Sequence, residues 1–223
     1  MVVAEGVRLS LALLDTATGA RVRYDAGCGA DRPYVTASVV KAQILAALLL
    51  REDGRLDAGV RERAAAMIRC SDNDAATELW RAIGGAAGLD ASSARLGLTA
   101  TRADERGRWG LTRTTAADQL RLLQAVFGDP SPLGPAGSAY LRELMAGVVA
   151  GQDWGVSAAG PAALKNGWLP RTGTGLWVVN SVGRVRAPDG RTLLVAVLSD
   201  GHASLAAGIA AVEEAVRAAA GRG

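Results

Sequence analysis

Apolar and polar residues alternate in two short segments near the start of the chain. Residues 7–15 read Val-Arg-Leu-Ser-Leu-Ala-Leu-Leu-Asp, and residues 20–24 follow after Thr-Ala-Thr-Gly. A period of two is typical of β-strands, and a short polar segment containing glycine is typical of a tight turn. We therefore predict two strands joined by a hairpin, followed by a Gly-rich loop over residues 25–33.

The middle of the chain has the pattern of buried and amphipathic helices. Residues 38–53 are apolar nearly all round, which predicts a helix buried on every side, with Thr36 or Ser38 as its cap and Gly54 at its end. A polar loop is predicted over residues 97–113. Amphipathic helices are predicted over residues 57–69, 74–83, 86–96, 115–127 and 137–150, with a turn over residues 129–135.

The end of the chain returns to strands, which we predict over residues 162–164, 175–185 and 191–198, and closes with a helix over residues 203–219. Pro188-Asp189-Gly190 is the predicted hairpin turn. Strands at both ends with helices between them predict an α+β fold. We expect residues 1–53 and 151–223 to share one antiparallel sheet, and residues 54–150 to form a helical subdomain of the same unit.

The composition excludes several classes of function. The 25 Lys and Arg residues against 22 Asp and Glu residues give a formal charge of +3, and the arginines are scattered, so nucleic acid is not an expected partner. One histidine and two cysteines are too few for a zinc site. The longest apolar run, Ile44–Leu50, is too short to span a bilayer. We expect a monomer with no metal, no cofactor and no membrane segment.

Lysine is nearly absent from this chain. Of the 25 basic residues, Lys41 and Lys165 are the only lysines, and all the others are arginine. Lysine differs from arginine in that it can lose its proton in a protein and act as a base. Both lysines are therefore candidates for chemistry.

Both lysines also lie within short motifs. Ser38-Val-Val-Lys41 opens the buried helix and places a hydroxyl and an amine one turn apart on the same face. A serine hydroxyl becomes a nucleophile when a base takes its proton, and lysine can be that base if burial or a nearby cation lowers its pKa. Ser71-Asp72-Asn73 and Lys165-Asn166-Gly167 follow in that order along the chain. The first motif alone occurs easily by chance, whereas the three together do not.

With these motifs the sequence resembles the superfamily of serine β-lactamases and penicillin-binding proteins over essentially its whole length. The segment 114–117, Thr-Thr-Ala-Ala, is similar to the start of the helix after the family's omega loop. The segments 152–155 and 164–168 are similar to actinobacterial members described as serine hydrolases, related to class A β-lactamases. The resemblance implies a five-stranded antiparallel sheet flanked by N- and C-terminal helices and a helical subdomain, reduced here.

The resemblance also implies a role for each motif residue. Ser38 would be the acylated nucleophile, Lys41 its general base and Ser71 the proton relay to the leaving group. Lys165 would supply positive charge to Ser71 and to a substrate carboxylate. Substrate binding is assigned to Asn73, Asn166, Gly167 and Trp168, and the oxyanion hole to the backbone N–H groups of Ser38 and Trp168.

The sequence departs from the family pattern in three ways. Only 33 positions separate Ser38 from Ser71, so the helical subdomain is reduced. Asn166 stands where the family has Thr or Ser. Residues 99–113 contain no Glu-Pro-x-Leu-Asn segment, whose glutamate drives water onto the acyl-enzyme. Glu105 is a candidate replacement, although a solvated loop charge among neighbouring arginines is the simpler interpretation.

We therefore expect a serine hydrolase that acts through an acyl-enzyme on an amide, ester or β-lactam, with slow β-lactam turnover. The alternatives are a D-Ala-D-Ala carboxypeptidase or penicillin-binding acyl transferase, and a non-catalytic ligand-binding member of the same fold. The substrate would be a small molecule or peptide carrying a carboxylate. Since the first strand begins at Val7, we expect a cytoplasmic protein, or an exported one if a signal segment precedes this sequence.

Other reactive side chains have simpler interpretations. His202 with Asp200 suggests a Ser-His-Asp triad, but we expect a turn after the last strand there. Cys70 is expected to be buried and inert, and its pairing with Cys28 stays open. Trp168 and Trp109 are candidate walls of the pocket. The remaining tryptophans are assigned to the core: Trp80, Trp154 and Trp177.

Overall fold

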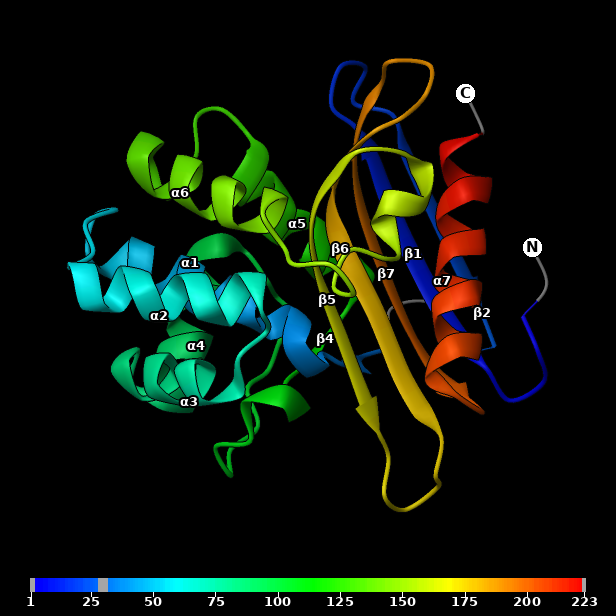
Figure 1. The fold of residues 1–223 in the computed structure, drawn as a ribbon, viewed down its shortest axis with the longest axis horizontal. Coiled ribbons are helices and arrows are strands. Elements are labelled where there is room, and N and C mark those ends of the chain that lie inside the picture. Colours follow the sequence, from blue (N-terminus) through cyan, green and yellow to red (C-terminus); the bar gives the residue numbers. More distant parts are fainter. Residues whose placement is uncertain (1–2, 28–31, 222–223) are drawn as a thin grey trace.

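The computed structural model describes residues 3–27 and 32–221, in which a five-stranded sheet carries helices on both faces (Figure 1). The strand order is β2-β1-β7-β6-β5, and every neighbouring pair is antiparallel. The two ends of the chain therefore share one sheet, as predicted. The strands are β1 (Arg8–Asp15), β2 (Arg21–Ala26), β5 (Ala162–Pro170), β6 (Trp177–Arg186) and β7 (Thr192–His202).

Alternate side chains of the strands pack into two separate hydrophobic clusters, one on each face of the sheet. Leu11 and Leu13 of β1 pack in the cluster of α7 (Leu205–Ala220), whereas Ala12 and Leu14 pack in the cluster of the helical subdomain. Successive side chains of a strand point to opposite faces, so a strand buried on both sides reads as a continuous apolar run. The same alternation applies to β5 and determines which of its side chains point toward the helical subdomain.

Helices cover the two faces unequally. The helix α7 lies alone along one face, and its N-cap Ser204 accepts a hydrogen bond from the Ala207 N–H at 3.1 Å (Figure 1). The other six helices lie beyond the opposite face. Within α1, residues 40–50 are all buried, which confirms the prediction. These helices are α1 (Val40–Arg51), α2 (Ala58–Arg69), α3 (Asn73–Ala82), α4 (Gly85–Leu96), α5 (Ala116–Phe127) and α6 (Gly134–Ala146).

Several element boundaries differ from prediction. In the described residues no helix precedes β1, so of the two terminal helices expected against the sheet, the structure contains α7. The predicted turn after the last strand is wrong, since β7 continues to His202. Two short strands, β3 (Tyr34–Val35) and β4 (Arg113–Thr114), form a second sheet. Two residues per strand are too few to leave a detectable period in the sequence.

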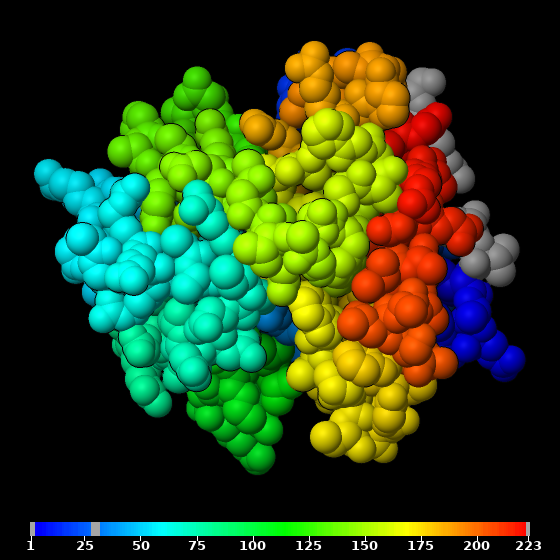
Figure 2. Space-filling model, in the orientation of Figure 1, coloured from blue at the N-terminus to red at the C-terminus, as the bar shows by residue number. Residues whose placement is uncertain are grey.

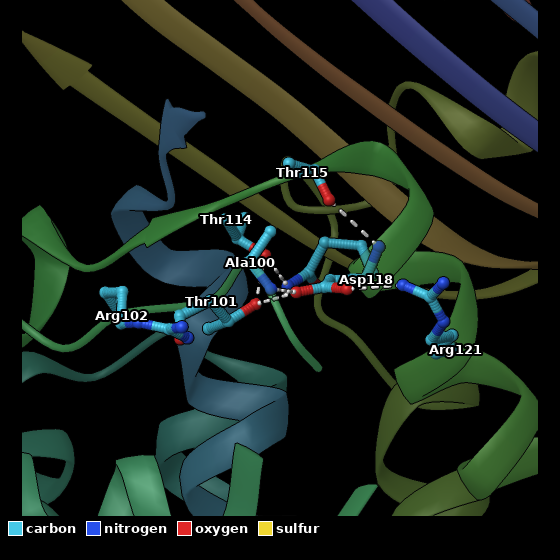
Figure 3. A network of polar contacts seen from close by, with 8 residues as sticks. Ala100, Thr101, Arg102, Thr114, Thr115, Asp118 and Arg121 are labelled. Carbon is cyan, nitrogen blue, oxygen red and sulfur yellow. Dashed lines mark hydrogen bonds and ion pairs between the residues drawn. The ribbon is translucent and has the colours of Figure 1, made fainter. Parts of the chain in front are cut away.

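A buried carboxylate holds the loop 97–113 against the start of α5 (Figure 3). Asp118 Oδ2 accepts hydrogen bonds of 2.8 Å from the Ala100 N–H and from Thr101 Oγ1. Its Oδ1 accepts one of 2.6 Å from Arg121. The Thr115 hydroxyl caps α5 by accepting from the Asp118 N–H at 3.2 Å. These bonds fix the start of the loop, and the short 3₁₀ turn η2 (Trp109–Leu111) lies near its other end.

Among the helices of the described residues, none combines the length and the apolar character needed to cross a membrane.

Candidate active site

Ser38 lies in a 3₁₀ turn, η1 (Ala37–Val39), which leads directly into α1. The backbone before it is constrained, because Ala37 has a φ of 47°, in the left-handed region that residues with a Cβ rarely adopt. The predicted side-chain cap is absent: neither Thr36 as N-cap of η1 nor Val39 as N-cap of α1 makes a side-chain cap bond. Ser38 is half-buried, and its hydroxyl has no hydrogen bond to a described residue.

Asn180 of β6 supports this turn from the sheet, a role that sequence reasoning missed. Its side-chain NH₂ donates hydrogen bonds of 2.9 Å to the carbonyls of Val35 and Thr36. Its Oδ1 accepts one of 3.0 Å from the Ser199 N–H. The three bonds use the whole side chain, which is fully buried. A buried-strand asparagine next to Val178 and Val179 is the signal in the sequence that could have pointed to it.

Gly167 lets β5 pass directly against the nucleophile. A Cβ at this position would lie 2.6 Å from the Ser38 nitrogen and 2.7 Å from the Val39 nitrogen. Only a residue without a side chain allows the two backbones to approach this closely. The strand therefore borders the N–H of Ser38, one of the two groups expected in the oxyanion hole.

The amine of Lys41 reaches the second motif. Its Nζ lies 2.6 Å from the Ser71 carbonyl oxygen, 3.2 Å from Ser71 Oγ and 2.8 Å from Asn73 Oδ1. Ser71 has a φ of 57° and lies between α2 and α3. Asp72 caps α3 by accepting from the Ala75 N–H at 2.7 Å. The turn between two helices thus holds Ser71 and Asn73 against the Lys41 amine.

Lys165 approaches Ser71 from the sheet. Ala163 of β5 packs in the cluster of the helical subdomain, and Lys165, two residues on, points to the same face. Its Nζ donates to Ser71 Oγ at 3.0 Å and to the Asn166 carbonyl at 2.9 Å. Ser71 Oγ therefore contacts both lysines of the chain.

Burial lowers the pKa of both lysines. Removal from water disfavours the charged amine and lowers the pKa of Lys41 to about 8, against an opposing effect of the Asp72 carboxylate. Burial first, and then the charge of Lys41, lower the pKa of Lys165 to about 7. Neutral amine is therefore present near pH 7, whereas an exposed lysine would be protonated.

A cavity of about 410 Å³ lies beside this cluster, and Figure 2 shows the segment that leads into α1 between the helical part and the β5–β6 hairpin. Ser38 and Asn73 line it, and Trp109 and Trp168 are among its walls, as predicted. The Trp109 ring centroid lies 4.9 Å from Lys41 Nζ, and Trp109 Nε1 donates to Thr77 Oγ1 at 3.2 Å. Trp168 packs on Trp154, with ring centroids 5.8 Å apart.

The structure places the Asn166 side chain away from this cavity. Its NH₂ donates bonds of 2.9 Å to the Gln152 and Trp154 carbonyls, so neither amide hydrogen is left for a substrate. The reason is strand parity, since Asn166 follows Lys165 and points to the opposite face of β5. Its amide holds the loop that positions Trp154.

Glu105 is also absent from the lining of the cavity. It is exposed in the loop 97–113, and the neighbouring Asp104 carboxylate pairs with Arg108. The described residues that line the cavity include no carboxylate.

The remaining candidates lie elsewhere. His202 is buried, with Nε2 2.8 Å from Ser199 Oγ, and Asp200 pairs with Arg8, so these side chains form no triad with Ser38. Cys70 is exposed, which corrects the expectation of burial, and Cys28 lies outside the described residues. In the described part of the chain, no three His, Cys, Asp or Glu side chains gather as a metal site.

The chain is similar to known proteins over most of its length. Residues 55–222 match the model of the Beta-lactamase enzyme family. The chain is 32% identical over 205 residues to the "Putative lipoprotein LppW" of Mycobacterium tuberculosis and of Mycobacterium bovis. That alignment covers 86% of this chain and 63% of the relative, so the chain spans less than two thirds of the length of these proteins.

Solved structures share the fold over nearly the whole chain. A beta lactamase from Xanthomonas campestris is 25% identical with a TM-score of 0.76, covering 96% of this chain and 91% of the other. An ancestral class A beta-lactamase is 28% identical with a TM-score of 0.73, covering 95% and 93%. The structure of PBP-A has a TM-score of 0.80 at 21% identity, covering 97% and 90%, and supports the fold alone.

Proposed function

The chain belongs to the Beta-lactamase enzyme family, and on that premise we propose that it is a serine hydrolase that forms an acyl-enzyme on Ser38. The observation that carries the proposal is the contact of both lysine amines with one hydroxyl, Ser71 Oγ, beside the cavity that Ser38 lines. Such a cluster supplies what an acyl transfer needs: a neutral amine to accept a proton and an ammonium group to return one.

The hydrogen bonds of Lys41 are compatible with a neutral amine. Two of its neighbours, the Ser71 carbonyl and Asn73 Oδ1, can only accept hydrogen bonds. The two N–H groups of a neutral amine satisfy both, and the lone pair of Nζ is left to take a proton from a hydroxyl. Lys165 donates to Ser71 Oγ and to the Asn166 carbonyl, and we propose that it keeps its proton in the active form, although its pKa is lowered further than that of Lys41.

In the proposed acylation, Ser38 Oγ attacks the substrate carbonyl carbon and its proton passes to the neutral Lys41 amine. The N–H groups of Ser38 and Trp168 stabilise the oxyanion. When the bond to the leaving group breaks, that group takes a proton from Ser71 Oγ. Ser71 recovers a proton from Lys41, which returns to its neutral form. The products of this step are an ester on Ser38 and a protonated leaving group.

We propose that hydrolysis of this ester is slow for β-lactams. Water must lose a proton as it attacks, and the described cavity lining offers no carboxylate to accept that proton. The Trp109 ring covers one side of the Lys41 amine, and its only polar hydrogen is donated to Thr77. An amine acceptor carries its own nucleophilic lone pair, so the same features favour transfer of the acyl group to an amine, as in a penicillin-binding acyl transferase, as the second candidate.

The experiment is a stopped-flow reaction with a chromogenic cephalosporin. We expect a burst equal to one product per enzyme, followed by turnover at least a hundredfold slower than the burst. The Ser38→Ala variant, a matched control, should show neither phase. Rapid linear turnover without a burst would refute slow hydrolysis, and no reaction with any ester, amide or β-lactam would favour the non-catalytic binding alternative.

We also propose that the protein acts outside the cytoplasm on a small molecule or peptide that carries a carboxylate. The support for export is the name of the mycobacterial relatives, which describes a lipoprotein. Fractionation of cells that express the full-length gene tests this, and recovery of the protein in the cytoplasm alone would contradict it.

A further inference from the structure

A second cavity, of about 280 Å³, lies where β1, β3 and the β5–β6 hairpin meet. Its lining contains three arginines, Arg8, Arg113 and Arg171, and one carboxylate, Asp200, so the side chains carry an excess of two positive charges. A water molecule takes up about 30 Å³ in the liquid, so the space admits a group of the size of phosphate or a small dicarboxylate.

The charges of this cavity are only partly neutralised by the protein. Arg8 and Asp200 form a two-point ion pair, with Arg8 Nε 2.7 Å from Asp200 Oδ1 and a second contact from Nη2 to Oδ2. In contrast, neither the Arg113 nor the Arg171 guanidinium has an acidic or hydrogen-bonding partner among the described residues. Arg113 and Arg171 are both exposed at this concave surface, and each guanidinium group can bind a carboxylate or phosphate through two parallel hydrogen bonds.

The same three chain segments line this cavity and the active site. Val35 borders the arginine cavity, and Ala37 and Ser38 border the active site. In the loop before α5, Leu111 lines the active site and Arg113 the second cavity. The two cavities are therefore neighbours along these segments.

The third shared segment is the end of β5. Leu169 lines the active site, and Arg171, two residues further on, lines the arginine cavity. Thr174 of the following hairpin lines it as well and adds a hydroxyl. One strand end thus connects the acylation site to a set of donors that favours anions.

We propose that the arginine cavity binds a carboxylate or phosphate group, and that the substrate acylating Ser38 carries this anion as a second recognition element; the latter half rests on the proposed function. Asp200 opposes anion binding, but its charge is held by Arg8. Arg113 and Arg171 are then substrate-selecting residues, and the chemistry at Ser38 does not require them.

Binding is tested first without catalysis, by calorimetric titration of the Ser38→Ala protein with inorganic phosphate and, separately, with succinate at low ionic strength. We expect one saturable site for at least one of the two, and the tighter of them identifies the anion. Adding Arg113→Gln and Arg171→Gln should weaken binding at least tenfold. The control pair, Arg81→Gln with Arg186→Gln, removes the same charge from exposed positions outside the cavity lining and should change affinity less than twofold. No saturable binding, or equal losses in both pairs, would overturn the proposal.

The link to the substrate is tested with two ester substrates that differ only in a carboxylate or the corresponding carboxamide. In the Arg113→Gln, Arg171→Gln protein, KM for the carboxylate ester should rise at least tenfold with kcat unchanged, and the carboxamide ester should be unaffected. Equal effects on both esters would contradict the second recognition element. If neither ester acylates the parent protein, the proposed function fails while the titration result still stands.

Discussion

The hydroxyl of Ser71 contacts the amines of Lys41 and Lys165, and burial lowers the pKa of both amines. One amine affects the proton affinity of the other, so the two titrate as a pair with apparent pKa values that belong to the pair. The arrangement is active when the pair holds one proton, because acylation needs a base and the leaving group needs an acid.

The rate of Ser38 acylation should therefore depend on pH in a bell shape. A lowered lysine pKa means that the neutral amine appears at lower pH than in free lysine, so the rate should rise with pH through about 7 to 8. The rate should fall again when the second proton leaves. The measurement is the second-order rate of acylation by a penicillin between pH 5 and 10, quenched and read by mass spectrometry. A rate that first rises near pH 10 would show unperturbed lysines and contradict the site.

Gly167 offers a second test at the level of a single residue. In Gly167→Ala the new Cβ would lie 2.6 Å from the Ser38 nitrogen, so β5 and η1 must separate. Overpacking of this kind costs about 1–3 kcal/mol, and we expect acylation to slow at least tenfold. Gly173→Ala is the matched control, because no atom lies within 4 Å of its added Cβ. Urea unfolding and acylation rates measure both effects, and equal behaviour of the two variants would contradict the close approach.

The elements place these residues through strand parity and hydrogen bonds between elements. The sequence predicts the pairing of Ser38 with Lys41 and the motif at Ser71, because each depends on residues close together in the chain. The first lies on one helix turn and the second on one turn between helices. The resemblance assigns Asn166 to substrate binding together with Lys165. Alternation along β5, however, points the two side chains to opposite faces of the sheet. Asn180 could not be predicted, since its role depends on which segment crosses β6 in space.

Asn180→Ala tests whether β6 supports the entry to α1. The substitution leaves the Val35 carbonyl and the Ser199 N–H without their buried partner, whereas the Thr36 carbonyl keeps the Val39 N–H as a donor at 3.3 Å. Each unsatisfied group costs about 1–3 kcal/mol, so we expect a loss of several kcal/mol in the free energy of unfolding, on the order of 3 kcal/mol after relaxation. Acylation should slow more than tenfold in the protein that remains folded. Unchanged acylation in a destabilised protein would limit Asn180 to a structural role.

For the whole molecule, the sequence predicts that the two ends of the chain share one sheet. The reason is that the apolar strand segments lie at both ends of the chain, with the helices between them in sequence. The terminal helix expected before β1 and the buried Cys70 were not borne out in the described residues. The resemblance to the family implies the first and the usual burial of single cysteines the second, so neither rests on a pattern in this chain. The fold brings a helix start, an interhelical turn and a strand together at one cavity, and this meeting of three elements is the basis of the proposed acyl-enzyme.

Intact-mass spectrometry after incubation with penicillin, followed by peptide mapping, tests that basis most directly. We predict that the protein gains the mass of one whole penicillin molecule, since ring opening loses no atoms. The adduct should lie on the peptide that contains Ser38 and should persist for many minutes. The folded Ser38→Ala protein should gain nothing. An adduct on any other residue, or none on the folded parent, would contradict the account.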